Sequence, residues 1–302
     1  MIKFNRFKYP GGRNESLKDF DPDYSAGFPV KEQAATELET CKRRLAELQN
    51  LLYSQNQYSL LIILQGMDAS GKDGIIKHVM SGVNPQGIKN RSFSTPSAEE
   101  YSHDYMWRCI RELPERGQIG IFNRSYYEEV LITRIHPEFL VKQRLPRLPE
   151  TPEEFSHFWK TRYQDINNFE KYLTNNGYII LKFMLNIGYE EQRTRFLSRI
   201  NNPAKNWKFK VDDLRERQYW DEYIQVYQDM FNQTSTHYAP WYIIPANKKR
   251  TSRLIICSII NTMLESLDLH YPEVPEPQKI ELQVAKEVFE SEIHDEIINP
   301  AQ

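Results

Sequence analysis

Four short apolar runs recur along the chain, and each has the length of a β-strand. They cover residues 59–65, 118–123, 178–185 and 241–246, and within each run the apolar residues mostly follow one another without alternation. A continuous apolar run of this length is typical of a strand that is buried on both faces, as in a parallel sheet covered by helices. The pattern therefore predicts a buried parallel sheet.

Helical spacing appears before, between and after these runs. From Leu38 to Leu52 the apolar residues recur three and four positions apart, which predicts a helix over residues 31–55. Ser97 and Glu100 form a capping-box pattern at the start of one further helix, and Gly177 marks the end of another. The further helices are predicted over 73–83, 97–114, 153–177 and 251–267. Strands that alternate with helices indicate a doubly wound α/β fold.

The two ends of the chain differ from this pattern. Residues 1–30 contain Pro, Gly, Asp and aromatic residues without periodicity, and predict an N-terminal arm laid over the body of the protein or over a partner. From about Glu276 the pattern is helical and mildly acidic, so residues 271–302 predict a C-terminal helical tail. Since the sequence shows no internal repeat and no low-complexity linker, we expect residues 1–302 to form a single domain.

Composition narrows the functional class. The net charge of −2 argues against a globally basic nucleic-acid binder. The three cysteines, Cys41, Cys109 and Cys257, lie far apart, which favours neither a zinc site nor a disulfide framework and fits a reducing cytosol. The first thirty residues lack the apolar core of a signal peptide, and no uncharged apolar run reaches about 18 residues. We expect a soluble cytoplasmic protein that binds neither membranes nor nucleic acid.

The loop after the first predicted strand has the pattern G-x-x-x-x-G-K, formed by Gly66, Gly71 and Lys72. In such a loop the backbone N–H groups converge on phosphate oxygens and add to the positive end of the following helix. The lysine supplies a flexible positive charge to a second phosphate. Because the loop follows a predicted buried strand and opens a helix, it predicts a phosphate-binding site.

Two aspartates depart from the usual form of this loop. Asp73 stands where a serine or threonine normally follows the lysine, and it is either a metal ligand or an acidic residue of the first helical turn. Asp68 lies inside the loop, where its charge would repel phosphate unless a cation intervened. Magnesium is usually held by one or two carboxylates together with phosphates. Asp68 is therefore interpreted as a magnesium ligand or as a base facing an acceptor phosphate, with a turn residue that bonds its own backbone as the alternative.

A second candidate segment, "IFNRSYYEEV", ends the second predicted strand. In open α/β folds, ligands bind beyond the carboxyl ends of strands, where Asn123, Arg124 and Glu128 are expected. Thymidylate-type nucleotide kinases have an acid before the arginine, and Asn123 takes its place here. We expect Arg124 to bind phosphate rather than form a structural ion pair. Glu128 would supply the missing carboxylate, with Glu129 as the alternative.

Residues 193–210 contain six basic residues and no acidic one. Arg195 and Arg199 are four positions apart and share a helix face, and Lys205 and Lys208 follow after a break. Such a run is often only a solvated surface. After the third strand of a phosphate-binding fold it favours a mobile lid, predicted over 190–220, that closes over a polyanion and neutralises its charge.

Several motifs in this order resemble those of the polyphosphate kinase 2 family: "GMDASGKDG", "FSTPS", "LPERGQIGIFNRSYYEEVL", "NWKFKVDDL", "YWDEYIQVYQDM" and "WYIIPA". The resemblance extends from about residue 25 to 270, and the N-R-S-x-Y-E and G-K-D forms resemble its class III. It implies a P-loop kinase-like fold, a three-layer αβα arrangement with a parallel sheet and a helical lid. It also implies magnesium-dependent phosphate transfer between inorganic polyphosphate and nucleotides.

The resemblance assigns roles to residues. Asp68 and Lys72 correspond to Walker A, and Asn123 and Arg124 to the family's Walker B D-R-S. We expect Asp68, Lys72, Arg124 and Glu128 to be catalytic, with Asp68 and Glu128 holding Mg²⁺ or Mn²⁺. The residues expected to bind nucleotide or polyphosphate are Gly66, Ala69, Gly71, Asp73, Asn123, Arg193, Arg199, Lys205 and Lys208.

The expected function is reversible phosphate transfer from polyphosphate to adenine or guanine nucleoside mono- and diphosphates, by a homodimer or homotetramer. An ATP-dependent nucleoside monophosphate kinase of thymidylate-kinase type is the main alternative. A nucleotide-sensing or polyphosphate-binding module without turnover and a nucleic-acid binder are weaker alternatives.

Overall fold

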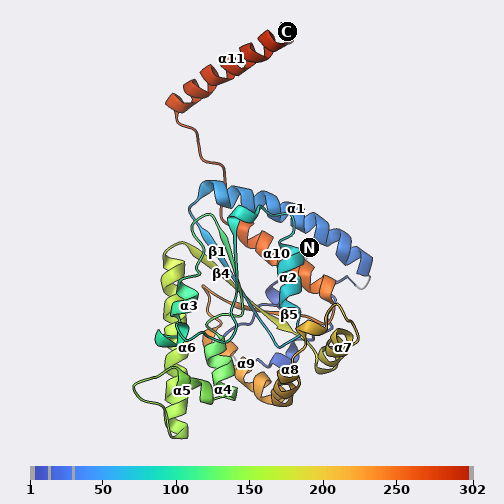
Figure 1. The fold of residues 1–302 in the computed structure, drawn as a ribbon, viewed down its shortest axis with the longest axis vertical. Coiled ribbons are helices and arrows are strands. Elements are labelled where there is room, and N and C mark those ends of the chain that lie inside the picture. Colours follow the sequence, from blue (N-terminus) through green and yellow to red (C-terminus); the bar gives the residue numbers. More distant parts are fainter. Residues whose placement is uncertain (1–3, 13–14, 29–30, 299–302) are drawn as a thin grey trace. The chain divides into compact units, whose positions relative to one another are not determined.

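A computed structural model describes residues 4–12, 15–28 and 31–298 of the chain (Figure 1). The chain divides into two compact units, Met1–Leu269 and His270–Gln302. The second unit contains α11 (Glu276–Ile298), within the segment expected to form a helical tail, and its side chains are exposed as far as Glu292. Among the described residues, no helix combines the length and the apolar composition needed to span a bilayer.

The first unit is built on one five-stranded sheet in the order β2-β3-β1-β4-β5, in which all neighbouring strands are parallel. The strands are β1 (Ser59–Gln65), β2 (Ile88–Ser92), β3 (Ile119–Asn123), β4 (Tyr178–Asn186) and β5 (Trp241–Pro245). The predicted α/β fold with a parallel sheet is therefore confirmed. The four apolar runs of the sequence form β1, β3, β4 and β5.

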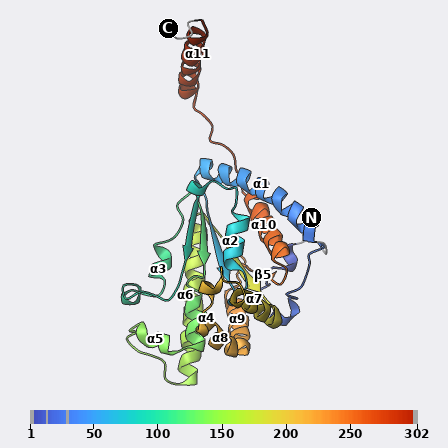
Figure 2. The same cartoon turned by 45° about the vertical axis from the view of Figure 1, so that its right-hand side comes forward.

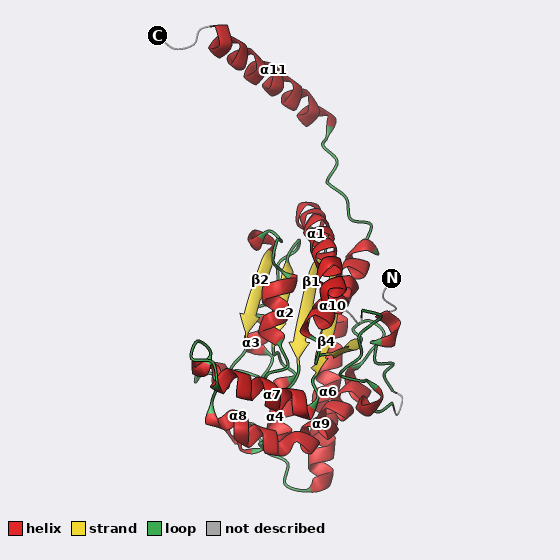
Figure 3. Ribbon diagram, turned by 90° about the vertical axis from the view of Figure 1, so that its right-hand side faces the viewer, coloured by secondary structure: helices red, strands yellow, loops and turns green. Residues whose placement is uncertain are grey.

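Helices cover both faces of the sheet (Figures 1 and 2). One face carries α1 (Lys31–Gln55), α2 (Lys72–Val79) and α10 (Lys249–Glu265), and the other carries α4 (Glu128–Ile135), α6 (Pro152–Asn175) and α9 (Trp220–Thr234). The other α-helices of this unit among the described residues are α3 (Trp107–Ile110), α5 (Glu138–Lys142), α7 (Tyr189–Ile200) and α8 (Val211–Glu216). Figure 3 shows α7 and α8 beyond the carboxyl ends of the strands.

The central strand β1 contributes to the core on both faces. Leu60, Ile62 and Leu64 pack in the core cluster that includes α1 and α10, whereas Leu61 and Ile63 pack in the cluster that includes α4, α6 and α9. Successive side chains of a strand point to opposite faces, so a strand that is covered on both faces is mostly apolar along its whole length. This explains the continuous apolar run.

The N-terminal segment extends the sheet beyond β5. The N–H of Tyr9 donates to Trp241 O at 2.8 Å, and the N–H of Ile243 donates to Phe7 O at 2.7 Å. Lys8 and Tyr242 thus form an antiparallel bridge. Parts of the predicted arm, residues 1–3, 13–14 and 29–30, lie outside the described residues.

The helix predicted over 97–114 is wrong. The capping box forms, because the N–H of Ser97 donates to Glu100 Oε2 at 2.7 Å and the N–H of Glu100 donates to Ser97 Oγ at 3.2 Å. It starts only a 3₁₀ turn, however, and α3 begins at Trp107. Between them the carboxylate of Asp104 accepts the N–H of Met106 at 2.9 Å, which replaces a helical bond by a local turn.

Candidate active site

The predicted phosphate-binding loop connects β1 to α2 at the carboxyl end of the central strand. Gly66 has φ +142° and Gly71 has φ +114°. A Cβ at Gly66 would lie 2.9 Å from Leu185 O and 2.9 Å from Ser70 Oγ, so only glycine fits this position. The Oγ of Ser70 is buried and has no hydrogen-bond partner among the described residues. A phosphate oxygen would satisfy it.

The ammonium of Lys72 lies inside this loop. Its Nζ donates to Gly66 O at 2.5 Å and to Met67 O at 3.3 Å. Burial, and then the nearby charge of Arg124, lower the pKa of Lys72 to about 8. A bound phosphate would raise the pKa of Lys72 again and keep the ammonium charged, as expected for a lysine that binds an anion.

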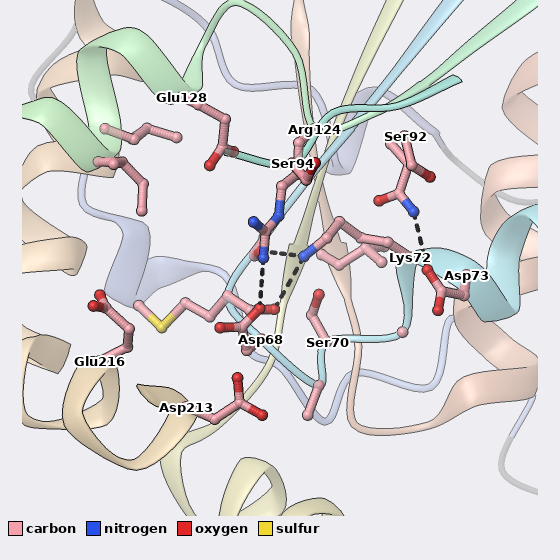
Figure 4. A pocket seen from close by; sticks show the side chains of 18 of the residues that line it. Asp68, Ser70, Lys72, Asp73, Ser92, Ser94, Arg124, Glu128, Asp213 and Glu216 are labelled. Atoms are coloured by element: carbon pink, nitrogen blue, oxygen red, sulfur yellow. Dashed lines mark hydrogen bonds and ion pairs between the residues drawn. The ribbon is translucent and has the colours of Figure 1, made fainter. Parts of the chain in front are cut away.

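Asp68 points into the same space rather than into the apolar interior. Its Oδ1 lies 2.9 Å from Nη2 of Arg124, and the two side chains are 31% and 36% exposed (Figure 4). Arg124 follows β3 directly and has φ +64°, a left-handed conformation that is uncommon for a residue with a side chain. Strained backbone of this kind is concentrated at functional sites. The structure therefore brings the two predicted motifs together.

Asp73 and Asn123 also meet. Asn123 Nδ2 donates to Asp73 Oδ1 at 2.9 Å, and Lys208 Nζ lies 3.6 Å from Asp73 Oδ2. These contacts connect the first turn of α2, the end of β3 and the basic segment after α7. Asp73 thus orients its neighbours, and because it is mostly exposed the contact with Lys208 adds little stability.

The two adjacent glutamates after β3 have different surroundings. Glu128 faces Arg124, and its charge is the largest cause that raises the pKa of the Arg124 guanidinium. Glu129 is buried and forms an ion pair with Arg108 at 3.2 Å. Burial raises the pKa of Glu129, and the arginine opposes that effect. Glu128, rather than Glu129, is therefore placed to act beside Arg124.

The predicted lid segment contributes cations to the site. Arg199, Lys205, Lys208 and Lys210 line the same cavity as the loop. Arg193 does not line it: its side chain is 64% exposed and pairs with Glu190 at 3.1 Å on the outer face of α7. Two positions along a helix point about 200° apart, so Arg193 and Arg195 cannot face the same side.

Arg195 has a role that the sequence did not predict. Its side chain is 7% exposed, and its guanidinium donates to Ala69 O at 2.9 Å, to Ser70 O at 2.8 Å and to Ala246 O at 2.5 Å. It also pairs with Glu191 at 2.7 Å. Arg195 therefore holds the carbonyl side of the phosphate loop, and this leaves the N–H side for a ligand.

Further charged residues at the site were missed from the sequence. Lys249 and Arg253, one turn apart at the start of α10, line the cavity next to Arg195. Burial lowers the pKa of both, and neighbouring cations add to that effect. The predicted lid segment also contains acidic groups that line the cavity. Burial, and then the charge of Asp68, raise the pKa of Asp213.

All these groups surround one cavity of about 930 Å³. Among the residues that line it, lysines and arginines outnumber aspartates and glutamates by eleven to seven, although the chain as a whole is slightly acidic. Figure 4 shows Asp68 with Arg124 on one side and Asp213 and Glu216 on the other. Within the described parts of the chain, no group of three or more His, Cys, Asp or Glu side chains is arranged to hold a metal.

A further wall of the cavity is formed by the residues after β2, from Phe93 to Pro96, together with Tyr101 and Arg108. Arg108 Nη1 donates to Ser94 O at 2.8 Å, which fixes this segment beside Glu129. The sequence did not predict β2, whose residues are half-buried or exposed, so this wall of the site was not located in advance.

Comparison with known proteins points to one family. The family model described as Polyphosphate kinase 2 (PPK2) matches residues 30–273. The chain is 46% identical over 282 residues to the ADP-polyphosphate phosphotransferase of Rhodopseudomonas palustris, covering 93% of this chain and 96% of that protein. It is 44% identical over 265 residues to the AMP/ADP-polyphosphate phosphotransferase of Meiothermus ruber, covering 87% and 93%.

A solved structure agrees with this similarity. The crystal structure of Polyphosphate Kinase 2 from Arthrobacter aurescens TC1 superposes with a TM-score of 0.82 at 37% sequence identity. The match covers 93% of this chain and 95% of the other. The similarity therefore includes the sheet, the loop and the segments around the cavity.

Proposed function

The chain belongs to the polyphosphate kinase 2 family, and on this basis we propose that it transfers phosphoryl groups from inorganic polyphosphate to AMP and ADP, reversibly. The names of the two relatives cover both acceptors, and the chain is about equally identical in sequence to each relative. We extend the proposal to guanine nucleotides, and we expect a homodimer or homotetramer.

One observation carries the proposal: Lys72, Arg124 and Asp68 converge at the carboxyl ends of β1 and β3, inside a cavity with an excess of cations. Phosphoryl transfer needs little covalent chemistry from the protein, but it needs two anions held in line with their charge neutralised. The cation excess around the loop suits a donor longer than one nucleotide.

Each residue then has a distinct task. The loop N–H groups and Ser70 bind phosphate oxygens, and Lys72 neutralises the phosphate nearest to them. Arg124 binds the transferring phosphoryl group, and the lid cations Arg199, Lys205 and Lys208 close over the donor chain and exclude water. No protein nucleophile is required, because the acceptor phosphate attacks directly.

We propose Mg²⁺ or Mn²⁺ as the cofactor, held by Asp68 and Glu128. The donor set fits such an ion, since hard divalent cations take one or two carboxylates and complete their shell with phosphate oxygens and water. The absence of a ready-made three-residue cluster among the described residues agrees with a metal that arrives with phosphates. When bound, the ion neutralises charge that develops during transfer.

The test uses the purified protein with two donors in separate reactions. With ADP, polyphosphate and Mg²⁺ we expect formation of ATP. With AMP in place of ADP we expect ADP first and then ATP. The nucleotide products of both reactions are measured over time by chromatography. With ATP plus AMP or dTMP and no polyphosphate, we expect no more than slow turnover. Formation of ADP from ATP and AMP without any reaction of polyphosphate would instead support the nucleoside monophosphate kinase alternative.

A further inference from the structure

A buried ion pair lies beneath the turn that carries Arg124 and Glu128. Lys182 of β4 and Glu170 of α6 are both 0% exposed, and Lys182 Nζ lies 2.7 Å from Glu170 Oε2. Neither residue lines the cavity. Taking two charges out of water is costly, and a buried pair is weak evidence for stability, so it calls for a different explanation.

The pair is the centre of a hydrogen-bond network that includes two tyrosines. The hydroxyls of Tyr126 and Tyr127 both donate to Glu170 Oε1, at 2.9 and 2.8 Å. Lys182 Nζ donates to Tyr127 Oη at 2.8 Å and to Thr234 O at 2.8 Å, in addition to Glu170. All three protons of the ammonium thus have acceptors. A buried network satisfied in this way is rigid.

The two tyrosines stand between the residues that act on phosphate. Arg124 is held at one end, where its N–H donates to Leu64 O at 3.0 Å, and it keeps the left-handed φ of +64°. At the other end the N–H of Glu128 donates to Ser125 O at 3.1 Å. Such a conformation persists only where the surroundings over-determine it, and the two phenols fix the middle of the turn.

We propose that Glu170 and Lys182 are positioning residues for phosphoryl transfer: the carboxylate holds Tyr126 and Tyr127 by one oxygen and thereby sets the direction of Arg124 and Glu128. This inference rests on the function proposed above. Neither charged residue touches a substrate, and both act through the turn.

The chemistry of the network explains why a carboxylate is used. One oxygen that accepts from two phenols fixes both rings relative to each other, which apolar packing alone would not do. Burial, and then the charge of Glu170, raise the pKa of both tyrosines well above the usual value, so the phenols stay protonated and continue to donate. Lys182 balances the charge of the carboxylate across the network.

The first test removes the phenol hydrogen bonds and keeps the rings. We expect the double variant Tyr126→Phe/Tyr127→Phe to lose about 100-fold in kcat with polyphosphate and ADP, because a small displacement of a catalytic group has an effect of this size. The KM for polyphosphate should rise, because Arg124 binds the donor, and the KM for ADP should change by less than about threefold. The matched control is Tyr163→Phe. Tyr163 lies on α6 and is also buried, and its hydroxyl accepts from Arg134 Nη1 at 2.9 Å outside the network. The kcat of Tyr163→Phe should stay within about twofold of wild type.

The second test separates the acceptor oxygen from the charge. Glu170→Gln/Lys182→Met removes both charges and keeps a side-chain oxygen at position 170 that can accept from the two phenols. We expect it to keep at least about a third of the kcat, whereas Glu170→Leu/Lys182→Met loses about 100-fold. Melting temperatures of all variants show whether the loss of kcat in a variant is accompanied by a loss of thermal stability. Equal kcat in the two double variants would overturn the positioning role, as would a tyrosine variant whose kcat loss matched that of the control.

Binding gives a readout that does not depend on turnover. Affinity for tripolyphosphate, measured by calorimetry, should fall in the double tyrosine variant and stay unchanged in Tyr163→Phe. If wild type made no ATP from polyphosphate, the proposed function would fail, and this comparison would still decide whether the network positions Arg124. Equal tripolyphosphate affinity in wild type and in the tyrosine variant would overturn the inference.

Discussion

Asp68 Oδ1 and Arg124 Nη2 lie 2.9 Å apart although 56 positions separate the two residues along the chain. They meet because β1 and β3 are parallel neighbours, so the loops at their carboxyl ends leave the sheet at the same edge. Both side chains remain about one-third exposed, so a phosphate can reach the guanidinium and compete with the carboxylate for it. Phosphate binding to Arg124 would then release Asp68 to hold a cation.

Asp68→Asn tests this relationship. An amide keeps the shape of the side chain but loses the negative charge, so we expect kcat to fall about 10³-fold. The free energy of unfolding should change by less than about 1 kcal/mol, because the ion pair is partly exposed. The measurements are the rate of ATP formation and a urea titration.

The matched control for Asp68→Asn is Asp229→Asn, which removes an exposed carboxylate 3.0 Å from Arg134. It should leave the rate unchanged. A rate for Asp68→Asn within about tenfold of wild type would contradict the assignment of Asp68 to the site.

Lys72 predicts a specific dependence on pH. Since its pKa in the folded protein is about 8, below the ordinary value of 10.5, the free protein loses this cation as the pH rises through about 8. The value of kcat/KM for polyphosphate should therefore fall above about pH 8, because kcat/KM reports the free enzyme. Lys72→Met should lose most turnover, and Lys77→Met, an exposed change on the same helix, should lose none.

The lowered pKa of Lys72 also affects stability: the free energy of unfolding should rise with pH in the range where kcat/KM falls. Between the folded and unfolded pKa values of Lys72 the unfolded state binds more protons, so the free energy of unfolding rises with pH in that range. Relative to Lys72→Met, wild type should gain about 2 kcal/mol between about pH 7 and about pH 9.5. Urea titrations of both proteins at the two pH values measure this gain. A constant difference between the two proteins would mean that Lys72 is not buried as the structure shows.

The sequence predicted the interior of the fold better than its edges. The run at 59–65 coincides with β1 because both faces of that strand are covered, which favours apolar side chains at every position except Ser59 and Gln65 at its two ends. The edge strand Ile88–Ser92 was missed because its side chains are polar and half-buried or exposed, so its pattern does not differ from that of a loop. The helix over 97–114 was wrong because a local hydrogen bond, which the N–H of Met106 donates to the carboxylate of Asp104, competes with helical bonding.

The candidate site was likewise predicted only in part from the sequence. The loop and Arg124 were located because glycine spacing and the ends of buried strands have direct backbone meaning. The sequence analysis expected Arg193 to bind nucleotide or polyphosphate and gave Arg195 no such role, because the sequence does not show which face of α7 lies against the loop. In the structure Arg195, and not Arg193, lines the cavity. Lys249 and Arg253 were missed because their approach to the loop depends on the packing of α10, which is distant in sequence.

Arg195 and Arg193 provide a matched pair within α7. Arg195→Lys keeps the charge but loses the planar fork that reaches several carbonyls of the loop and of residue 246. We expect a loss of about 2–4 kcal/mol in the free energy of unfolding and a clear fall in kcat. Arg193→Lys, at an exposed position, should change stability by less than about 0.5 kcal/mol. Similar effects of the two changes on melting temperature would show that Arg195 does not hold the loop.

Arg253 tests how far along α10 the donor chain extends. Lysines and arginines at a helix N-terminus are unfavourable beside the positive end of the helix dipole, unless an anion binds there. Lys249 and Arg253 occupy the first turns of α10 and line the cavity, so we expect them to bind polyphosphate units beyond those held by the loop. Arg253→Glu should raise the KM for long polyphosphate about tenfold or more, with little change in kcat.

Donor length separates this role of Arg253 from a general effect of charge. If a long donor chain passes over α10, it contacts Arg253 with phosphate units beyond the three of tripolyphosphate, so the KM for tripolyphosphate should change much less in Arg253→Glu than the KM for long chains. Lys77→Glu makes the same change of net charge at an exposed position of α2 outside the cavity, and both KM values should stay close to wild type. Initial rates with the two donors at constant ionic strength measure the difference, since salt screens exposed charges. If Arg253→Glu raised both KM values equally, the donor chain would not pass over α10, and the arginine would act only through the local potential around the loop.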